Sequence, residues 1–150
     1  MNLLNKAIVL RYEASAGAAL RALLGDDSTP YVRFWAGIAP SGTALPFVRF
    51  NIIPLDTSHS ALKATGATRY IETVTGQFSI FVNEYQHDQA WSIRDALVKL
   101  FDDHRPNFGT GAASGHVISA LRTGSGRLIN DPESGYNLVV EYRYVLEEIL

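Results

Sequence analysis

Four histidines are the side chains in this sequence best suited to acid–base or metal chemistry; they are His59, His87, His104 and His116. No two of them stand four residues apart, the spacing that places two imidazoles on one helix face around a metal ion. His104 follows Asp102 and Asp103, but neighbouring residues on a helix point about 100° apart and do not converge on one atom. The triplet therefore predicts a solvated helix end, with His104 favourably placed near the negative end of the helix dipole.

The glycine-rich stretches lack the motifs of nucleotide binding and nucleophilic catalysis. Gly109, Gly111 and Gly115 do not have the spacing of a dinucleotide fingerprint, and they precede an expected strand where that fingerprint precedes a helix. Residues 123–127 (TGSGR) form no Gly-x-Ser-x-Gly elbow, and the chain has no Walker lysine motif. We expect no enzyme, no catalytic or metal site, and no cofactor.

Composition narrows the possible partners. The chain has no cysteine, which excludes disulfides and thiolate metal sites, and its net charge of -2 argues against a basic face for nucleic acid. Aromatic–basic neighbours such as Arg49-Phe50 and Arg33-Phe34-Trp35 could stack on bases. On a slightly acidic chain, a core role for these aromatic residues is favoured.

The chain has the size of one domain, residues 1–150. Its 47% hydrophobic and 19% charged content is typical of a soluble globular protein. Lys6 interrupts the apolar start, and no apolar run approaches the ~18 residues of a membrane span. These features predict an amphipathic N-terminal helix and a soluble protein that is not exported and does not bind membranes.

A long strand followed by a helix organises the centre of the chain. Residues 69–83 alternate apolar and polar side chains with a period of two, which is typical of a strand with one dry face. The expected helix at 86–104 has apolar residues three and four positions apart, a single stripe that can lie on a sheet. This stripe contains Ala90, Ile93, Leu97, Leu100, Phe101 and His104.

Shorter elements surround this unit. A helix begins near Leu3, is interrupted at 15–17, resumes at 18–24 and ends at Gly25. Further strands are expected at 31–36, 47–53, 116–122 and 136–147, and irregular connections at 37–45, 55–68, 105–115 and 123–135. The order predicts an α+β fold: a mainly antiparallel sheet of about five strands, with the N-terminal and central helices on one face.

The central strand is long for a domain of this size. Fourteen residues, 70–83, span about 46 Å at ~3.3 Å per residue, whereas the globule is about 35–40 Å across. Gly76 could mark a bulge or bend, one end could project from the body, or a bent strand could lie wholly inside it. A projecting end and a partly apolar back face would suit a subunit interface; that face contains Ile71, Phe81, Val139 and Val145.

Several short features, taken in order, resemble the tail-completion or tail-terminator family of long-tailed bacteriophages. The N-terminal helix ends in ALRALLG at 19–25, and LPFV at 45–48 opens a strand that a polar hairpin loop and a long strand follow. Asn83-Glu84-Tyr85 leads into the alanine-containing helix at 90–101. DPESG at 131–135 precedes a last strand of the Tyr-x-Leu-x-Val-x-Tyr type, so the resemblance covers essentially the whole chain.

This resemblance implies a non-enzymatic virion protein of the tail–neck region, assembled in the cytoplasm of a bacterial host. Members of the family form a six-subunit ring that caps the major tail tube protein and presents its other face to a neck or stopper protein. DNA passes through the lumen without specific binding. The long polar connections at 55–68 and 123–135 are expected to contact these partners.

Eight residues on these connections and strand faces are candidate partner or subunit contacts: His59, Leu62, Lys63, Arg69, Ile71, Phe81, Arg122 and Arg127. Within the same class, a head–tail stopper or adaptor is the alternative. From other classes, a small α+β enzyme or ligand-binding domain would need a concave pocket that holds His104 or His116 with a carboxylate. A cellular interaction module of non-viral origin is the remaining alternative.

Overall fold

The computed structural model describes residues 2–55, 60–64, 67–110, 113–131 and 135–149, and at several strand ends it describes the backbone alone. In chain order the elements are α1 (Asn2–Glu13), the 3-10 turn η1 (Ser15–Gly17), α2 (Ala18–Leu24), β1 (Phe34–Ala36), β2 (Phe47–Pro54), β3 (Ser60–Ala64), β4 (Ala67–Val82), α3 (His87–Phe101), β5 (Asn107–Thr110), β6 (Ala113–Asp131) and β7 (Gly135–Ile149).

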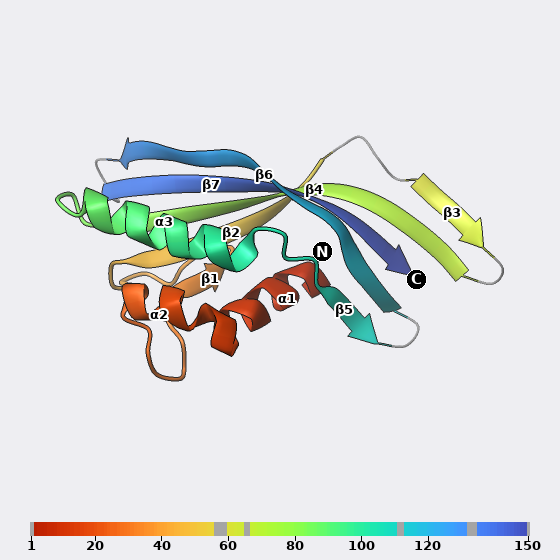
Figure 1. Ribbon diagram of the computed structural model, residues 1–150, viewed down its shortest axis with the longest axis horizontal. Coiled ribbons are helices and arrows are strands. Elements are labelled where there is room, and N and C mark those ends of the chain that lie inside the picture. The colour runs from red at the N-terminus through yellow and green to blue at the C-terminus, as the bar shows by residue number, and fades with distance from the viewer. Residues whose placement is uncertain (1, 56–59, 65–66, 111–112, 132–134, 150) are drawn as a thin grey trace.

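The described strands form one sheet of seven in the order β1-β2-β4-β7-β6-β5, and β3 pairs with β4 beyond the end of β2 (Figure 1). The β1–β2 pair is parallel, and the other pairs are antiparallel. The predicted α+β class is therefore confirmed, with two more strands than the sequence indicated.

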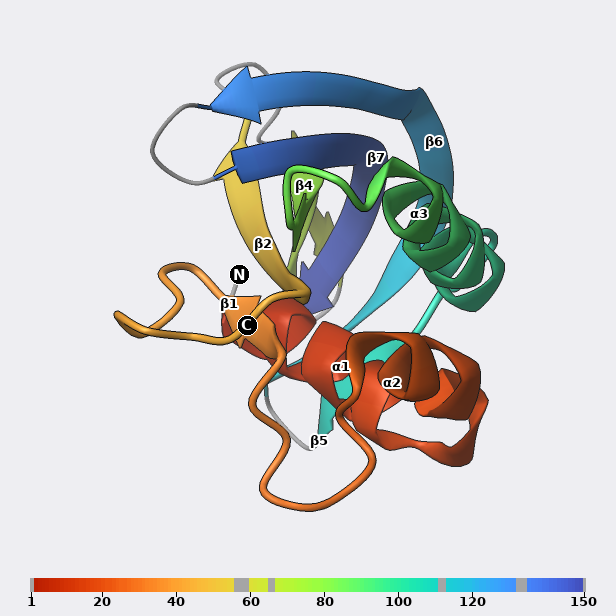
Figure 2. The same ribbon diagram turned by 90° about the vertical axis from the view of Figure 1, so that its left-hand side faces the viewer.

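The helices cover one face of the twisted sheet, as predicted (Figure 2). The buried face of α1 consists of apolar residues four positions apart, Leu4, Ile8 and Tyr12. The predicted stripe of α3 is buried at Ala90, Ile93, Leu97, Leu100 and Phe101, but the helix ends before His104. Alternate residues of the central strands β4 and β7 complete the core, namely Val74, Phe78, Ile80, Leu138, Val140, Tyr142, Tyr144 and Leu146.

The interruption of the N-terminal helix lies where the sequence placed it, at η1 between α1 and α2. A methyl group on Gly17 would lie 1.9 Å from the carbonyl oxygen of Tyr12, so the turn has room for glycine alone. Gly25 ends α2 with a left-handed φ of 69°, a conformation that glycine adopts without steric cost.

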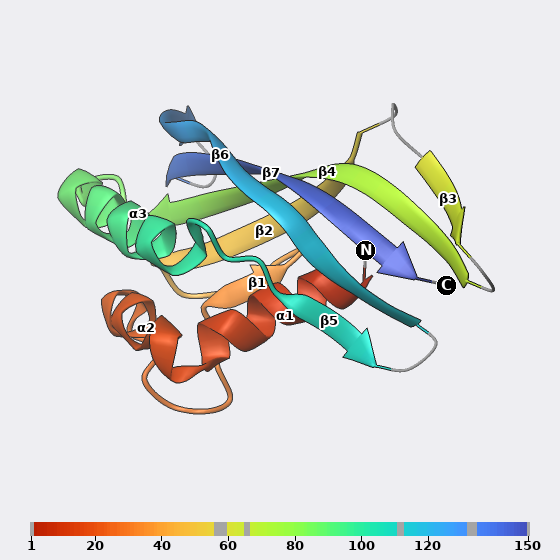
Figure 3. The same cartoon turned by 45° about the vertical axis from the view of Figure 1, so that its right-hand side comes forward.

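The long strand β4 has no bulge at Gly76. The pairing continues through this residue on both sides, to Ile52 of β2 and to Tyr142 of β7. The glycine instead makes room for a neighbour, because an added Cβ would lie 2.5 Å from the ring of Tyr144. The strand curves as a whole, and its first residues extend with β3 beyond the helices (Figure 3).

Three connections predicted to be irregular are largely strand. Residues 55–68 contain β3 and the start of β4, and residues 105–115 contain β5 and the start of β6. In 123–135, β6 continues to Asp131; along the whole strand its pairing with β7 has register shifts at 117/119, 122/124 and 124/127. The predictions were wrong here because pairing with the long strands β4 and β7 overrides weak local β-propensity.

Candidate functional site

One edge of the sheet is open along most of β6. β5 covers this strand at Ala113–His116, and the N–H of Val117 donates to the carbonyl of Pro106, so in the described part of the chain residues 118–131 pair with β7 alone. Four large apolar side chains on this stretch are exposed: Ile118 (40%), Leu121 (59%), Leu128 (39%) and Ile129 (40%). A long edge strand with exposed apolar side chains is a template for pairing with another chain.

The opposite edge of the sheet, formed by β1 and β2, is also largely open. β1 pairs with β2 over three residues only, Phe34–Ala36 with Val48–Phe50. Three large apolar residues at or beside this edge are exposed: Val32, Ile38 and Ile53. The sheet thus has exposed apolar side chains at both edges. This arrangement suits an assembly in which the β6 edge of one copy contacts the β1–β2 edge of the next.

Three of the predicted contact residues belong to the outer hairpin, which β3 forms with the start of β4. Leu62 and Lys63 lie on β3, and Leu62 pairs with Arg69 of β4 across a regular antiparallel ladder. The structure describes the backbone alone at these three positions, and His59 lies outside the described residues. The hairpin places Leu62, Lys63 and Arg69 together at the end of the sheet that the helices do not cover (Figure 3).

Ile71 and Phe81 lie on the face of β4 that points away from the helices. Ile71 is half-buried, and Phe81 is 6% exposed because it stacks on Phe47 at a ring separation of 4.7 Å. Both edges of β4 are already paired along most of its length. Any subunit contact of this strand along its paired length must therefore use side chains.

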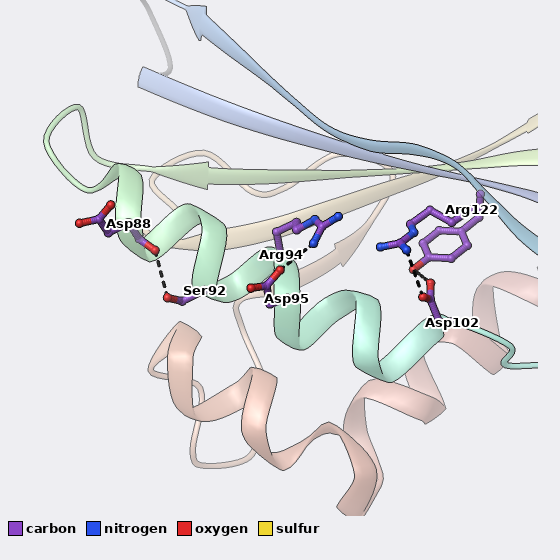
Figure 4. A network of polar contacts seen from close by, with 7 residues as sticks. Asp88, Ser92, Arg94, Asp95, Asp102 and Arg122 are labelled. Carbon is purple, nitrogen blue, oxygen red and sulfur yellow. Dashed lines mark hydrogen bonds and ion pairs between the residues drawn. The ribbon is translucent and has the colours of Figure 1, made fainter.

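Arg122 belongs to a polar network at the end of α3 (Figure 4). Its Nη2 lies 3.5 Å from Oδ2 of Asp102, and the hydroxyl of Tyr142 donates a 2.8 Å hydrogen bond to Oδ1 of the same carboxylate. Burial, and then the bond to Asp102, raise the pKa of Tyr142. Asp102 therefore joins the end of α3 to β6 and β7, while Asp102 and Asp103 are both exposed, as the predicted solvated helix end requires. Arg127 pairs with Val139 through its backbone.

His104 does not act as a cation at the helix end, contrary to the sequence prediction. Its Nε2 is buried and has no hydrogen-bond partner among the described residues. Burial, and then the nearby positive charge of Arg11, lower the pKa of His104 below its ordinary value of 6.5. The folded chain therefore holds the neutral imidazole.

This arrangement predicts an acid-dependent loss of stability. Below pH 6.5 the unfolded chain binds a proton on His104 before the folded chain does, so the free energy of unfolding falls as the pH drops toward the lowered pKa. We expect the His104→Gln variant to lose less stability than the wild type between pH 7.5 and 5. Urea unfolding at both pH values measures this difference, and equal losses in the two proteins would contradict the assignment.

The other described histidines lie on the surface. Nε2 of His116 is 3.4 Å from Oε2 of Glu147 on the neighbouring strand, with 44% of the His116 side chain exposed. The His87 ring contacts that of Tyr136. In the described part of the chain no three His, Asp or Glu side chains gather to hold a metal ion. His116 thus has the carboxylate that an acid–base pair needs, but on an open strand face.

The sequence contains one indication of the open β6 edge, an apolar pair in a stretch that was predicted to be a loop. Leu128 and Ile129 are adjacent apolar residues inside a stretch interpreted as a polar loop. Ile118 and Leu121 were placed in a strand without being identified as edge residues. An apolar pair in a supposed loop is informative because neighbouring exposed apolar side chains form a patch, and such patches mark interaction sites.

Comparison with solved structures identifies a fold that this chain shares. No protein-family model and no curated protein matches the chain. A chain of the solved structure titled "Virion of native gene transfer agent (GTA) particle" has a TM-score of 0.57, with 93% of this chain and 91% of that chain covered at 10% sequence identity. At this identity the likeness shows a shared fold.

A second solved structure reaches a TM-score of 0.45 at 16% identity, over 87% of this chain and 92% of that chain. No helix in the described residues is both long and apolar enough to span a membrane.

Proposed function

We propose that this protein is a tail-terminator subunit of a phage or phage-like particle, a structural component without catalytic activity. The observation that carries this proposal is the fold shared with a gene transfer agent virion chain over nearly the full length of both chains. The order of motifs that resembles the tail-terminator family supports the same conclusion. In this proposal the protein resides in the tail–neck region and assembles in the bacterial cytoplasm.

The open edges of the sheet support a ring. The β6 edge and the β1–β2 edge differ from one another, and each exposes large apolar side chains. Contact between two different edges is heterologous, and its repetition closes a ring when the rotation between copies allows it. We propose six copies, in line with the resemblance to the tail-terminator family.

The proposed ring has three kinds of neighbour. One face caps the major tail tube protein, and the other meets a neck or stopper protein. DNA passes through the lumen without specific binding, in keeping with the chain's net charge of -2, since a strongly basic lumen would hold the phosphate backbone. The outer hairpin of β3 and β4 is the proposed contact with the tube or the neck.

Removal of residues 58–66 tests this proposal. The deletion takes away all of β3 but none of the helix-covered core, so we expect a folded protein. Particles assembled with the variant should carry overlong tails or tails that fail to join heads. Electron microscopy of tail length and head attachment gives the result, and circular dichroism checks the fold of the variant.

A His59→Ala/Lys63→Ala double variant is a narrower test, because it removes two candidate contact side chains without a deletion; the same tail defect is expected if these side chains make the contact. Normal tails with the deletion variant would refute the terminator role. A position on the head side, away from the tube, in a reconstructed particle would instead identify a stopper or adaptor.

A further inference from the structure

A hollow opens on the sheet face opposite the helices, at the end of the sheet near the start of α3. Its volume is about 750 Å³, and it lies between the β1–β2 connection and the ends of β2, β4 and β7. Pro40 and Leu45 contribute to its wall, and Phe47, Arg49, Phe81 and Asn137 line the strand side. Neither the predicted partner contacts of the outer hairpin nor the open edge of β6 contributes to this hollow.

Arg49 is the positive charge of the hollow, and Glu84 is a negative charge in the same lining, but among the described residues Arg49 forms no ion pair with it or with any other carboxylate. Its guanidinium lies 5.3 Å from the centre of the Phe81 ring, and its Nε is buried without an acceptor. Other arginines are satisfied: Arg33 donates to the carbonyls of Ala44, Leu45 and Pro46. Arg49 has a stacking surface that fixes the guanidinium but no carboxylate that pairs with it.

Asn137 adds an unused acceptor to the same lining. Its Oδ1 is buried and receives no hydrogen bond from the described residues. The stacked rings of Phe47 and Phe81 give the hollow an apolar surface beside these polar groups. An unpaired donor, an unpaired acceptor and an aromatic surface are together complementary to a carboxylate, an amide N–H and an apolar side chain.

We propose that this hollow binds a segment of a partner protein that presents an aspartate or glutamate next to an apolar residue. The carboxylate pairs with Arg49 through charge-assisted hydrogen bonds, which are stronger than neutral ones. A backbone N–H of the segment donates to Asn137, and the apolar side chain packs on Phe47 and Phe81. The carboxylate of the partner is recognised by Arg49, whose guanidinium is held on the Phe81 ring and forms no ion pair within the described residues.

Nuclear magnetic resonance titration of the full chain tests the proposal with small probes. N-acetyl-Phe-Asp-amide should cause saturable shifts at the Arg49 Nε–H and at the rings of Phe47 and Phe81. N-acetyl-Phe-Asn-amide, which lacks the negative charge, should bind at least tenfold more weakly, and acetate alone should also bind more weakly because it lacks the apolar and amide groups. The Arg49→Gln variant should lose the saturable shifts, while Arg143→Gln, at an exposed arginine elsewhere on the sheet, should keep them.

Equal binding of the aspartate and asparagine probes, persistence of the shifts in Arg49→Gln, or absence of saturable shifts at Arg49 would overturn the proposal. Acetate binding as tight as that of the peptide would overturn the assignment to a protein segment. Should Arg49→Gln fail to fold, the comparison of probes on the wild-type chain still decides. The titration does not depend on ring formation, so its failure leaves the tail-terminator proposal intact.

Discussion

The Asp26→Ala variant should lose about 3–5 kcal/mol of its free energy of unfolding, a large share of the stability of a domain this size. The Asp26 carboxylate is 3% exposed and accepts three hydrogen bonds. They come from the Tyr12 hydroxyl at 2.5 Å, the Val32 N–H at 2.9 Å and the Arg33 N–H at 3.2 Å. The alanine would leave all three donors without their acceptor. Urea unfolding at pH 7, followed by circular dichroism, measures the loss.

This carboxylate joins three segments that are separate in the chain: α1, the turn after α2, and the approach to β1. Burial, and then the bond to Asp26, raise the pKa of Tyr12, so the phenol remains the donor at neutral pH. The exposed neighbour gives the matched control, because Asp27→Ala should change stability by no more than about 0.5 kcal/mol. A double-mutant cycle of Asp26→Ala with Tyr12→Phe should show a positive coupling energy. Equal effects of the Asp26 and Asp27 substitutions would contradict the role of this network.

The Gly17→Ala variant should lose about 3 kcal/mol, the upper end of the usual cost of overpacking. The added methyl group would lie 1.9 Å from the Tyr12 carbonyl oxygen and 2.7 Å from its carbon, both backbone atoms that cannot rotate away. The same carbonyl accepts a hydrogen bond from Arg21, so displacement of α1 would also break that contact. Thermal and urea unfolding of the purified variant would measure the effect.

Gly25→Ala separates this steric cost from a conformational one. A methyl group at Gly25 meets nothing within 4 Å, but the residue has a φ of 69°, which costs roughly 1–2 kcal/mol for a residue with a Cβ. We therefore expect Gly17→Ala to be the more destabilising of the two. The opposite order would mean that α1 and α2 can separate at little cost.

The helices could be predicted because their signals are local. Five residues of the α3 stripe from Ala90 to Phe101 follow the helical period and are buried, and Gly25 ends α2 where the sequence indicated. The alternation in residues 136–147 likewise predicted the two faces of β7. Each of these patterns lies within one element, where period and propensity act together.

The extent of the sheet could not be predicted, because its partners are distant in sequence. Gly124 and Gly126 are typical of a loop, yet Gly124 pairs with Glu141 and the surrounding residues complete β6. Likewise, β3 forms from a polar stretch that pairs with the start of β4. The open edge, and with it the proposed ring contact, depends on where this pairing stops. The Arg49 hollow was also missed, because it forms from three strands and a connection that lie far apart in the sequence.

The unbroken β4–β7 ladder limits how a subunit can adapt to its neighbours. Fourteen consecutive pairs join Arg69–Val82 to Tyr136–Ile149. A slip of one residue would move Glu141 and Arg143 to the helix-covered face and expose Val140 and Tyr142. These two strands therefore cannot slide past one another to relieve misfit on assembly. Adjustment of curvature between copies must take place in β6, whose three register shifts let its twist change locally without disturbing the core.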